Sequence, residues 1–207
     1  NCIKKPKNTK KKKEAVDAMF QRLCGRLREK AETPGKRAVM YVALGDSVTQ
    51  GCMELGVYEY ERTYHQVLKR RLEQRFYGTV VNVVNSGVAG DTAHGSRCRW
   101  HRDVIQHQPD LVTVLFGHND AHRGRDGVEP FAAAMRDLVR LIHAETEAEI
   151  VLMTPCMMMK RDNGRIAEAH RPLVPAFLKL AEENILPLYV EAVRTVAGET
   201  GVPCLDL

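Results

Sequence analysis

The sequence contains 207 residues, of which 44% are hydrophobic and 28% are charged, as in an ordinary globular protein. A chain of this length can bury the core of one α/β domain with a short appendage. It has no apolar run long enough to cross a bilayer, so we expect no membrane span.

The formal net charge of +5 originates at the amino-terminal end. A cluster of lysines accounts for it: Lys4, Lys5, Lys7, Lys10, Lys11, Lys12 and Lys13. Lysine-rich ends are usually solvated, so we predict a basic, disordered tail over 1–13 and no nucleic-acid partner. Binding of this tail to nucleic acid or anionic lipid is the alternative interpretation.

Six cysteines are scattered without C-x-x-C pairs, which argues against a zinc ribbon and a thioredoxin-type motif: Cys2, Cys24, Cys52, Cys98, Cys156 and Cys204. Reduced thiols are typical of a cytosolic protein, and 1–13 lacks the apolar middle of a signal peptide. We therefore expect a cytoplasmic location. The first residue is not Met, which leaves a removed leader open.

The first periodic segment is an amphipathic helix over 14–30, within a helix-and-linker region over 14–36. Thr33-Pro34-Gly35 ends it. Its apolar residues recur at helical spacing: Val16, Met19, Phe20, Leu23 and Leu27. We expect this face to pack on the chain's own core, with a partner chain as the less favoured alternative.

Buried strands and helices then alternate along the chain. Strands are predicted over 38–44, 79–84, 111–116 and 149–153, with a fifth opening within 201–207. Helices are predicted over 63–77 (closed by Gly78, with Val67, Leu68, Leu72 and Phe76 on one side), 96–106, 128–145 and 171–198, the last interrupted near Pro175 and Pro187. Such alternation, with right-handed crossovers, predicts a three-layer α/β/α fold around a parallel five-stranded sheet.

Polar motifs follow three of these strands. The first strand runs into Gly45-Asp46-Ser47, the second into a glycine loop ending Gly90-Asp91-Thr92, and the third into Gly117-His118-Asn119-Asp120. The carboxyl ends of parallel strands are where α/β sheets bind ligands. Ser47 is therefore a candidate exposed nucleophile.

With these three motifs in order, the chain resembles the SGNH hydrolases, also called the GDSL esterase/lipase family. The resemblance covers most of the chain after the amino-terminal segment and implies an SGNH-type domain over 37–207 with flavodoxin-like strand order. It implies ester hydrolysis through an acyl-serine intermediate, a small-molecule ester substrate and no cofactor. It makes Ser47 the nucleophile, and it assigns the oxyanion donors to the backbone N–H groups of Ser47 and Gly90 and to the side-chain amide of Asn119.

The neighbouring carboxylates are interpreted as supports of these loops. Asp46, Asp91 and Asp120 are better suited to accept hydrogen bonds from backbone N–H groups than to act in catalysis.

The catalytic base is missing from the motifs. In the family a His and its polar partner come downstream of the fifth strand, where this sequence ends, so the resemblance implies a catalytic His beyond Leu207. His94, His118 and His122 lie beside the motifs and are less favoured substitutes. Apart from His118 and His122, which span the Asn-Asp turn, these histidines and His101 lack the i, i+4 pairing with a third ligand that a zinc site shows, so no metal is predicted.

Several features keep two interpretations. Tyr58, Tyr60 and Tyr64, in or beside an irregular 52–62 segment, either line a substrate entrance or simply pack. The arginines around Trp100 are interpreted as a solvated face with a packing anchor rather than a nucleic-acid surface. Three consecutive methionines in a predicted loop over 156–164 are either core filler or an adaptable apolar wall.

A non-catalytic binding module, or an inactive fragment of the same fold, is the alternative to the esterase, because the base is absent from the motifs. A nucleotide-binding flavodoxin-like protein is a more distant third. The sequence leaves open whether the ester is an acetylated carbohydrate, a short acyl ester or a lysolipid, and it leaves oligomeric state open.

Overall fold

The structure is a computed structural model that describes residues 19–54, 57–156, 159–162, 164 and 166–207. The predictions of a disordered tail over 1–13 and of helix over 14–18 lie outside the described residues. Among the residues described, no helix has the length and apolarity needed to cross a membrane.

A five-stranded parallel sheet forms the centre of the molecule, in the order β4-β1-β5-β6-β7. Its strands are β1 Val39–Gly45, β4 Val81–Gly87, β5 Leu111–Leu115, β6 Glu149–Met153 and β7 Cys204–Leu205. This is the flavodoxin-like order that the resemblance implied, and it confirms the predicted three-layer α/β fold. A separate antiparallel hairpin joins β2 Cys52–Glu54 to β3 Val57–Tyr58.

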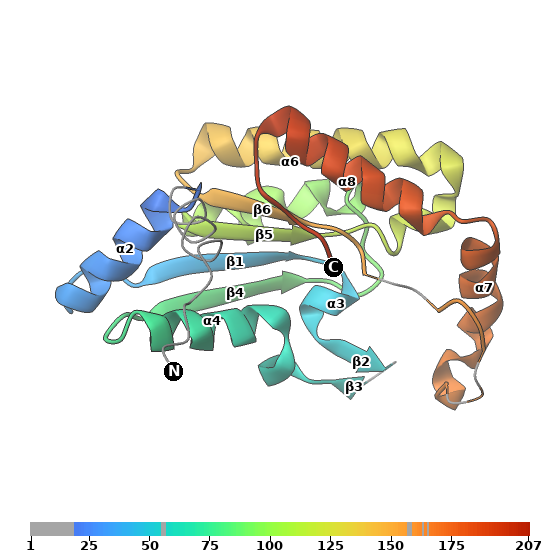
Figure 1. The fold of residues 1–207 in the computed structure, drawn as a ribbon, viewed down its shortest axis with the longest axis horizontal. Coiled ribbons are helices and arrows are strands. Elements are labelled where there is room, and N and C mark those ends of the chain that lie inside the picture. Colours follow the sequence, from blue (N-terminus) through green and yellow to red (C-terminus); the bar gives the residue numbers. More distant parts are fainter. Residues whose placement is uncertain (1–18, 55–56, 157–158, 163, 165) are drawn as a thin grey trace, which may run out of the picture.

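Helices cover both faces of the sheet (Figure 1). The α-helices are α2 Gln21–Glu32, α3 Ser47–Gln50, α4 Tyr64–Arg75, α5 Trp100–Asp103, α6 Val128–Glu145, α7 Val174–Glu182 and α8 Leu186–Thr200. Short 3₁₀ turns lie at Tyr60–Arg62, Gly95–Arg99, Ile105–His107, Asp120–Arg123, Arg125–Gly127 and Glu168–Leu173. Pro stands in the first turn of both α7 and α8, as the prolines near 175 and 187 predicted.

Each face of the sheet has its own apolar core because side chains alternate along a strand. Val42 and Leu44 of β1 belong to the larger core, which includes the buried faces of α6 and α8. Tyr41 and Ala43 of the same strand belong to the smaller core, to which α2 and α4 contribute.

The helix α2 packs on the chain's own domain, as expected. Leu23 and Leu27 are buried in the smaller core, and Phe20 packs against it. Met19, which the periodicity placed on the same face, is 54% exposed. In α4 the predicted apolar side is also narrower than expected, since Leu68, Leu72 and Phe76 pack on the core whereas Val67 is 40% exposed.

Other predicted elements have different bounds in the structure. The second strand ends at Gly87 instead of Val84, because Asn85 and Ser86 continue the register opposite Ala43 and Leu44. The helix predicted over 96–106 is split into Gly95–Arg99, α5 and Ile105–His107. Part of the segment expected to be irregular after the serine turn forms the β2–β3 hairpin.

The strand order reverses at β1. Because β1 lies between β4 and β5, the chain leaves β1 on one side and returns on the other. Ligands of open α/β sheets bind at such a reversal of strand order. The arrowheads of β1, β4 and β5 point to the end of the molecule where α3 and α7 lie (Figure 1).

Candidate active site

Ser47 is the first residue of a one-turn helix that begins directly after β1. Asp46 caps this helix: its backbone is extended and its carboxylate accepts a hydrogen bond from Val48 N at 3.0 Å. Gly51 ends the helix in a left-handed conformation, with φ of 98°. The cap and the strand fix Ser47 at the edge of the sheet, where its side chain is partly exposed.

Ser47, Gly90 and Asn119 line one cavity of about 570 Å³. The three residues come from the ends of β1, β4 and β5 and are far apart in the sequence. The structure thus brings together the residues to which the family resemblance assigned the nucleophile and the oxyanion donors. The rest of the lining is Cys52, Met53, Ala89, Met159, Ile166, Ala167, His170, Leu173 and Phe177.

The glycine loop is held close to α3. A Cβ on Gly87 would lie 2.1 Å from the backbone N of Gln50, so only glycine permits this approach. The side chain of Gln50 accepts a hydrogen bond from Ala89 N at 2.7 Å. Gly90 has a φ of 80°, which favours glycine for a second, conformational reason.

Asn119 joins the third motif to the glycine loop. Its Nδ2 donates to the backbone oxygen of Asp91 at 2.8 Å. A side-chain amide has two N–H groups, so one bond to Asp91 leaves the other as a possible donor to a ligand in the cavity.

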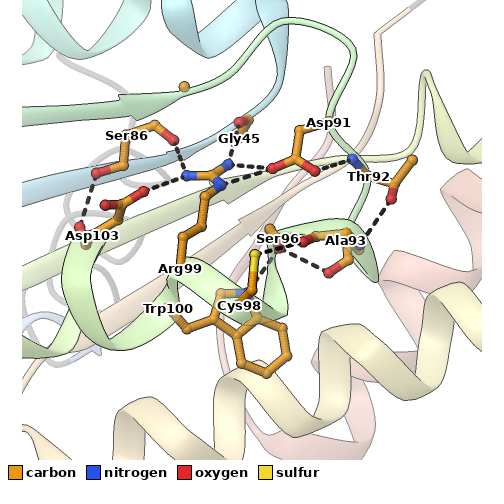
Figure 2. A network of polar contacts seen from close by, with 12 residues as sticks. Gly45, Ser86, Asp91, Thr92, Ala93, Ser96, Cys98, Arg99, Trp100 and Asp103 are labelled. Carbon is orange, nitrogen blue, oxygen red and sulfur yellow. Dashed lines mark hydrogen bonds and ion pairs between the residues drawn. The ribbon is translucent and has the colours of Figure 1, made fainter.

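Arg99 links the ends of β1 and β4 to the glycine loop through hydrogen bonds and ion pairs (Figure 2). Its guanidinium donates to the backbone oxygens of Gly45 at 3.2 Å and Ser86 at 2.8 Å. It also pairs with the carboxylates of Asp91 at 2.7 Å and Asp103 at 3.0 Å. Its side chain is only 7% exposed, so the interpretation of this segment as a solvated face is wrong for Arg99.

Asp91 and Asp120 make the hydrogen bonds of loop-fixing acceptors. Besides Arg99, Asp91 accepts from Thr92 N at 2.8 Å. Asp120 accepts from Ala93 N and Gly117 N, both at 3.1 Å, and thereby joins the second motif to the third. Burial raises the pKa of Asp120 to about 6, although these backbone N–H groups oppose the increase.

Both ring nitrogens of His118 have partners, Asp46 and Cys156, that do not line the cavity. Its Nδ1 lies 3.3 Å from Asp46 Oδ2, and its Nε2 lies 3.1 Å from the backbone oxygen of Cys156 and 3.4 Å from its sulfur. Burial alone would lower the pKa of His118, but the hydrogen bonds to Asp46 and Cys156 outweigh it and raise the pKa to about 10. Of the other two candidates, His94 and His122 are both exposed, and neither lines the cavity.

Several residues of the site were not predicted from the sequence, among them Gln50, Arg99 and His170. Gln50 and Arg99 hold the loops, and His170 lines the cavity opposite the strand ends. Gln50 lies within four residues of Ser47, so its position on the serine turn was the one available signal. Neither Arg99 nor His170 carries a motif or a spacing that points to the site.

Of the three tyrosines, only Tyr64 takes part in the core. Its hydroxyl lies 3.1 Å from Thr49 Oγ1, and burial raises its pKa to about 12. Tyr58 and Tyr60 stack on each other with ring centroids 5.9 Å apart and stay exposed. None of them lines the cavity.

Trp100 and the three consecutive methionines are the other features for which the sequence allowed two interpretations. Trp100 is a buried packing anchor that is 5% exposed, as expected, and its indole donates to Ser96. Of the three methionines, Met159 lines the cavity, whereas the other two lie outside the described residues. Over the residues that the structure describes, no cluster of three or more His, Cys, Asp or Glu is arranged to hold a metal ion.

Comparison with known proteins identifies relatives of this fold and sequence. An acetylxylan esterase of Geobacillus stearothermophilus is 34% identical over 84 residues, which span 36% of this chain and 38% of the relative's length. An arylesterase of Vibrio mimicus is 25% identical over 154 residues, or 74% of this chain and 72% of the relative.

Solved structures that superpose on this chain also include an acylhydrolase and an esterase. The lipase/acylhydrolase of Enterococcus faecalis superposes with a TM-score of 0.62 at 26% identity, covering 82% of this chain and 76% of that structure. The acetylxylan esterase Axe2 of Geobacillus stearothermophilus superposes with a TM-score of 0.57 at 23% identity, covering 81% and 75%, and so supports the fold. Residues 43–207, which include all three motifs, match the GDSL-like lipase/acylhydrolase family, and the chain belongs to that family.

Proposed function

We propose that this chain is a serine ester hydrolase in which Ser47 attacks the carbonyl carbon of a small carboxylic ester. The observation that carries the proposal is the shared cavity, in which one hydroxyl faces the same space as two candidate oxyanion donors. Membership of the family and the similarity to an acetylxylan esterase and an arylesterase support this reaction class.

In the first step the Ser47 oxygen bonds to the carbonyl carbon and the carbonyl oxygen becomes an oxyanion. The backbone N–H groups of Ser47 and Gly90 and the amide of Asn119 stabilise that charge. The alcohol then leaves, and water hydrolyses the acyl-serine. The donors are held before the substrate arrives, because Gln50 and Arg99 fix the loops that carry them.

The base that takes the Ser47 proton is assigned to a His of the family motif that follows the fifth strand. His118 is a poor alternative, since its raised pKa keeps it protonated at neutral pH and both its ring nitrogens already have partners in Asp46 and Cys156. His170 lines the cavity and is the alternative within this chain. Two catalytic mutants of the Geobacillus stearothermophilus acetylxylan esterase, one with a His and one with an Asp replaced by Ala, support the need for such a pair.

The cavity wall opposite the donors is apolar and favours small acyl esters. It consists of Met159, Ile166, Ala167, Leu173 and Phe177. Apolar walls with a few placed polar groups are typical of small-molecule sites. We expect acetyl and short-chain aryl esters to be accepted and long-chain esters to be hydrolysed slowly.

A serine-reactive fluorophosphonate tests the nucleophile directly. We expect an adduct on Ser47 and none on Ser86 or Ser96, because both of these are buried and hydrogen-bonded in the structure. These two serines serve as internal controls. An unlabelled protein that carries the downstream His, or a label on any other residue, would contradict the assignment of Ser47.

Hydrolysis of p-nitrophenyl acetate tests the rest of the site. Ser47→Ala should reduce turnover to background, and Asn119→Ala should reduce kcat by about a hundredfold, the usual loss for one oxyanion donor. His170→Ala should keep most of the turnover, since His170 lines the cavity without being assigned the base, whereas a loss equal to that of Ser47→Ala would move the base to His170. Background rates for a protein that carries the downstream His, with circular dichroism showing it folded, would favour the non-catalytic binding module.

A further inference from the structure

Three side chains form a line beside the cavity that the proposed ester hydrolysis does not use. They come from the ends of three adjacent strands: Asp46 follows β1, His118 follows β5 and Cys156 follows β6. The Cys156 sulfur lies 3.4 Å from His118 Nε2, and His118 Nδ1 lies 3.3 Å from Asp46 Oδ2. The order is that of a thiol, a base and an orienting carboxylate.

The geometry favours a charged pair within this line. Asp46 is fully buried and orients the imidazole. His118, at 14% side-chain exposure, is held close to the sulfur. The carbonyl of Cys156 accepts from the same nitrogen, which keeps the ring facing residue 156.

The directions of the pKa shifts of Cys156 and His118 agree with this geometry. The hydrogen bond to His118 is the largest influence on Cys156 and lowers the pKa of its thiol, against the opposing effects of burial and of the Asp46 charge. His118, whose pKa is raised, remains protonated at neutral pH. The charged groups that act on the sulfur are thus the His118 imidazolium, which stabilises a thiolate, and the Asp46 carboxylate, which opposes it.

We propose that Cys156 is a reactive thiolate and a site of modification by small electrophiles, hydroperoxides in particular. The sulfur attacks the terminal oxygen of the hydroperoxide, so that an S–O bond forms and the O–O bond breaks. The sulfur is oxidised to a sulfenic acid and the hydroperoxide is reduced. The departing alkoxide or hydroxide takes the proton of the His118 imidazolium and leaves as an alcohol or water.

Solvent exposure alone would make Cys98 and Cys204 more reactive than Cys156. Cys98 and Cys204 are both exposed, whereas Cys156 is half-buried. Neither exposed thiol has the advantage of Cys156: Cys98 makes a contact to the backbone oxygen of Gly95 at 3.5 Å, and burial and the Asp206 charge raise the pKa of Cys204. The two exposed cysteines are therefore matched controls within the same protein.

Alkylation of the folded protein by iodoacetamide, read cysteine by cysteine by mass spectrometry, tests the proposal. At pH 6 an ordinary thiol is almost entirely protonated. A stabilised thiolate is a somewhat weaker nucleophile but is present in far larger amount. We expect Cys156 to react about tenfold faster than Cys98 and Cys204 at pH 6. Between pH 6 and 8 its rate should rise less steeply than that of Cys204, whose pKa is raised.

His118→Gln removes the charged partner and should slow Cys156 about tenfold at pH 6, with Cys98 unchanged. Treatment of the unmodified protein with hydrogen peroxide and dimedone should place the sulfenic-acid adduct on Cys156 first. A Cys156 that reacts no faster than Cys98 at pH 6, or that is indifferent to His118→Gln, would overturn the proposal. If His118→Gln does not fold, the order and pH profile of the three cysteines in the unmodified protein decide alone.

Discussion

Replacing Arg99 should destabilise the fold far more than replacing its exposed neighbour Arg102, although both contact Asp103. The guanidinium of Arg99 serves four acceptor groups and its side chain is 7% exposed. Arg99→Met leaves the carboxylates of Asp91 and Asp103, each 15% exposed, without this buried partner. Breaking such a pair by removing one member costs about 3–5 kcal/mol, a large part of a total stability of about 5–15 kcal/mol.

Arg99→Lys keeps the charge but cannot keep the geometry. A lysine has three N–H donors on one nitrogen, so at least one of the four acceptor groups loses its partner. A buried acceptor without a partner costs about 1–3 kcal/mol. The lysine variant should therefore lie between the unmodified protein and Arg99→Met, and it provides a result if the methionine variant does not fold.

Urea unfolding followed by circular dichroism measures these differences. The control is Arg102→Met, because Arg102 is 70% exposed and such surface pairs contribute about 0–1 kcal/mol. In a chain of this size, the loss expected for Arg99→Met corresponds to a fall in Tm of about 10 °C. Equal unfolding midpoints for Arg99→Met and Arg102→Met would refute the reasoning, since they would show that the buried network adds nothing beyond a surface pair.

Gly87→Ala should be strongly destabilising, because the added Cβ would lie 2.1 Å from backbone, whereas at Gly90 it would meet no atom within 4 Å and only the φ of 80° opposes it. Thermal melting should show a large loss of stability for Gly87→Ala and a loss of about 1 kcal/mol for Gly90→Ala. Similar melting temperatures for the two variants would contradict the close packing of Gly87 on α3. Leu27→Ala should cost about 2–5 kcal/mol in urea unfolding, since Leu27 is fully buried. Met19→Ala, at a position 54% exposed, is its control, and equal effects would mean that α2 is not part of the core. The raised pKa of His118 means that the folded state binds the His118 proton more tightly than the unfolded state does, which stabilises the fold. This stabilisation is complete below about pH 6.5 and is lost as the pH rises through about 10. The stability difference between the unmodified protein and His118→Gln should therefore shrink from pH 7 to pH 10, and a difference that grows would show the opposite linkage.

The strands were predictable because they follow from local patterns, whereas the strand order and the oxyanion donors Gly90 and Asn119 came from the family resemblance. Continuous apolar runs mark buried parallel strands, and the bounds predicted for α6 and β6 match the structure. The strand order places the ends of β4, β1 and β5 side by side, and Ser47, Gly90 and Asn119 line one cavity there. Their catalytic roles remain predictions for the assays above.

The remaining features depend on partners distant in the sequence. Arg99 is buried because four acceptors from other segments surround it, and no periodicity in 96–106 indicates that. The same segment departs from a continuous helix near Val104, whose φ is −128°, where the Asp103 carbonyl accepts a hydrogen bond from Ser86. Such tertiary contacts override local propensity.

The two sides of the cavity have different origins in the chain. The polar side is built from three strand ends cross-linked by hydrogen bonds, so any change there disturbs the sheet. Most of the apolar side comes from described residues of one stretch, between Met159 and Phe177 outside the sheet, and Met53 of β2 adds to it. Substitutions in that stretch can therefore reshape the ligand space while the strand ends stay in place. Among related chains, changes in substrate preference are therefore expected to accumulate in this stretch. The residues that carry the reaction are expected to stay the same at the strand ends.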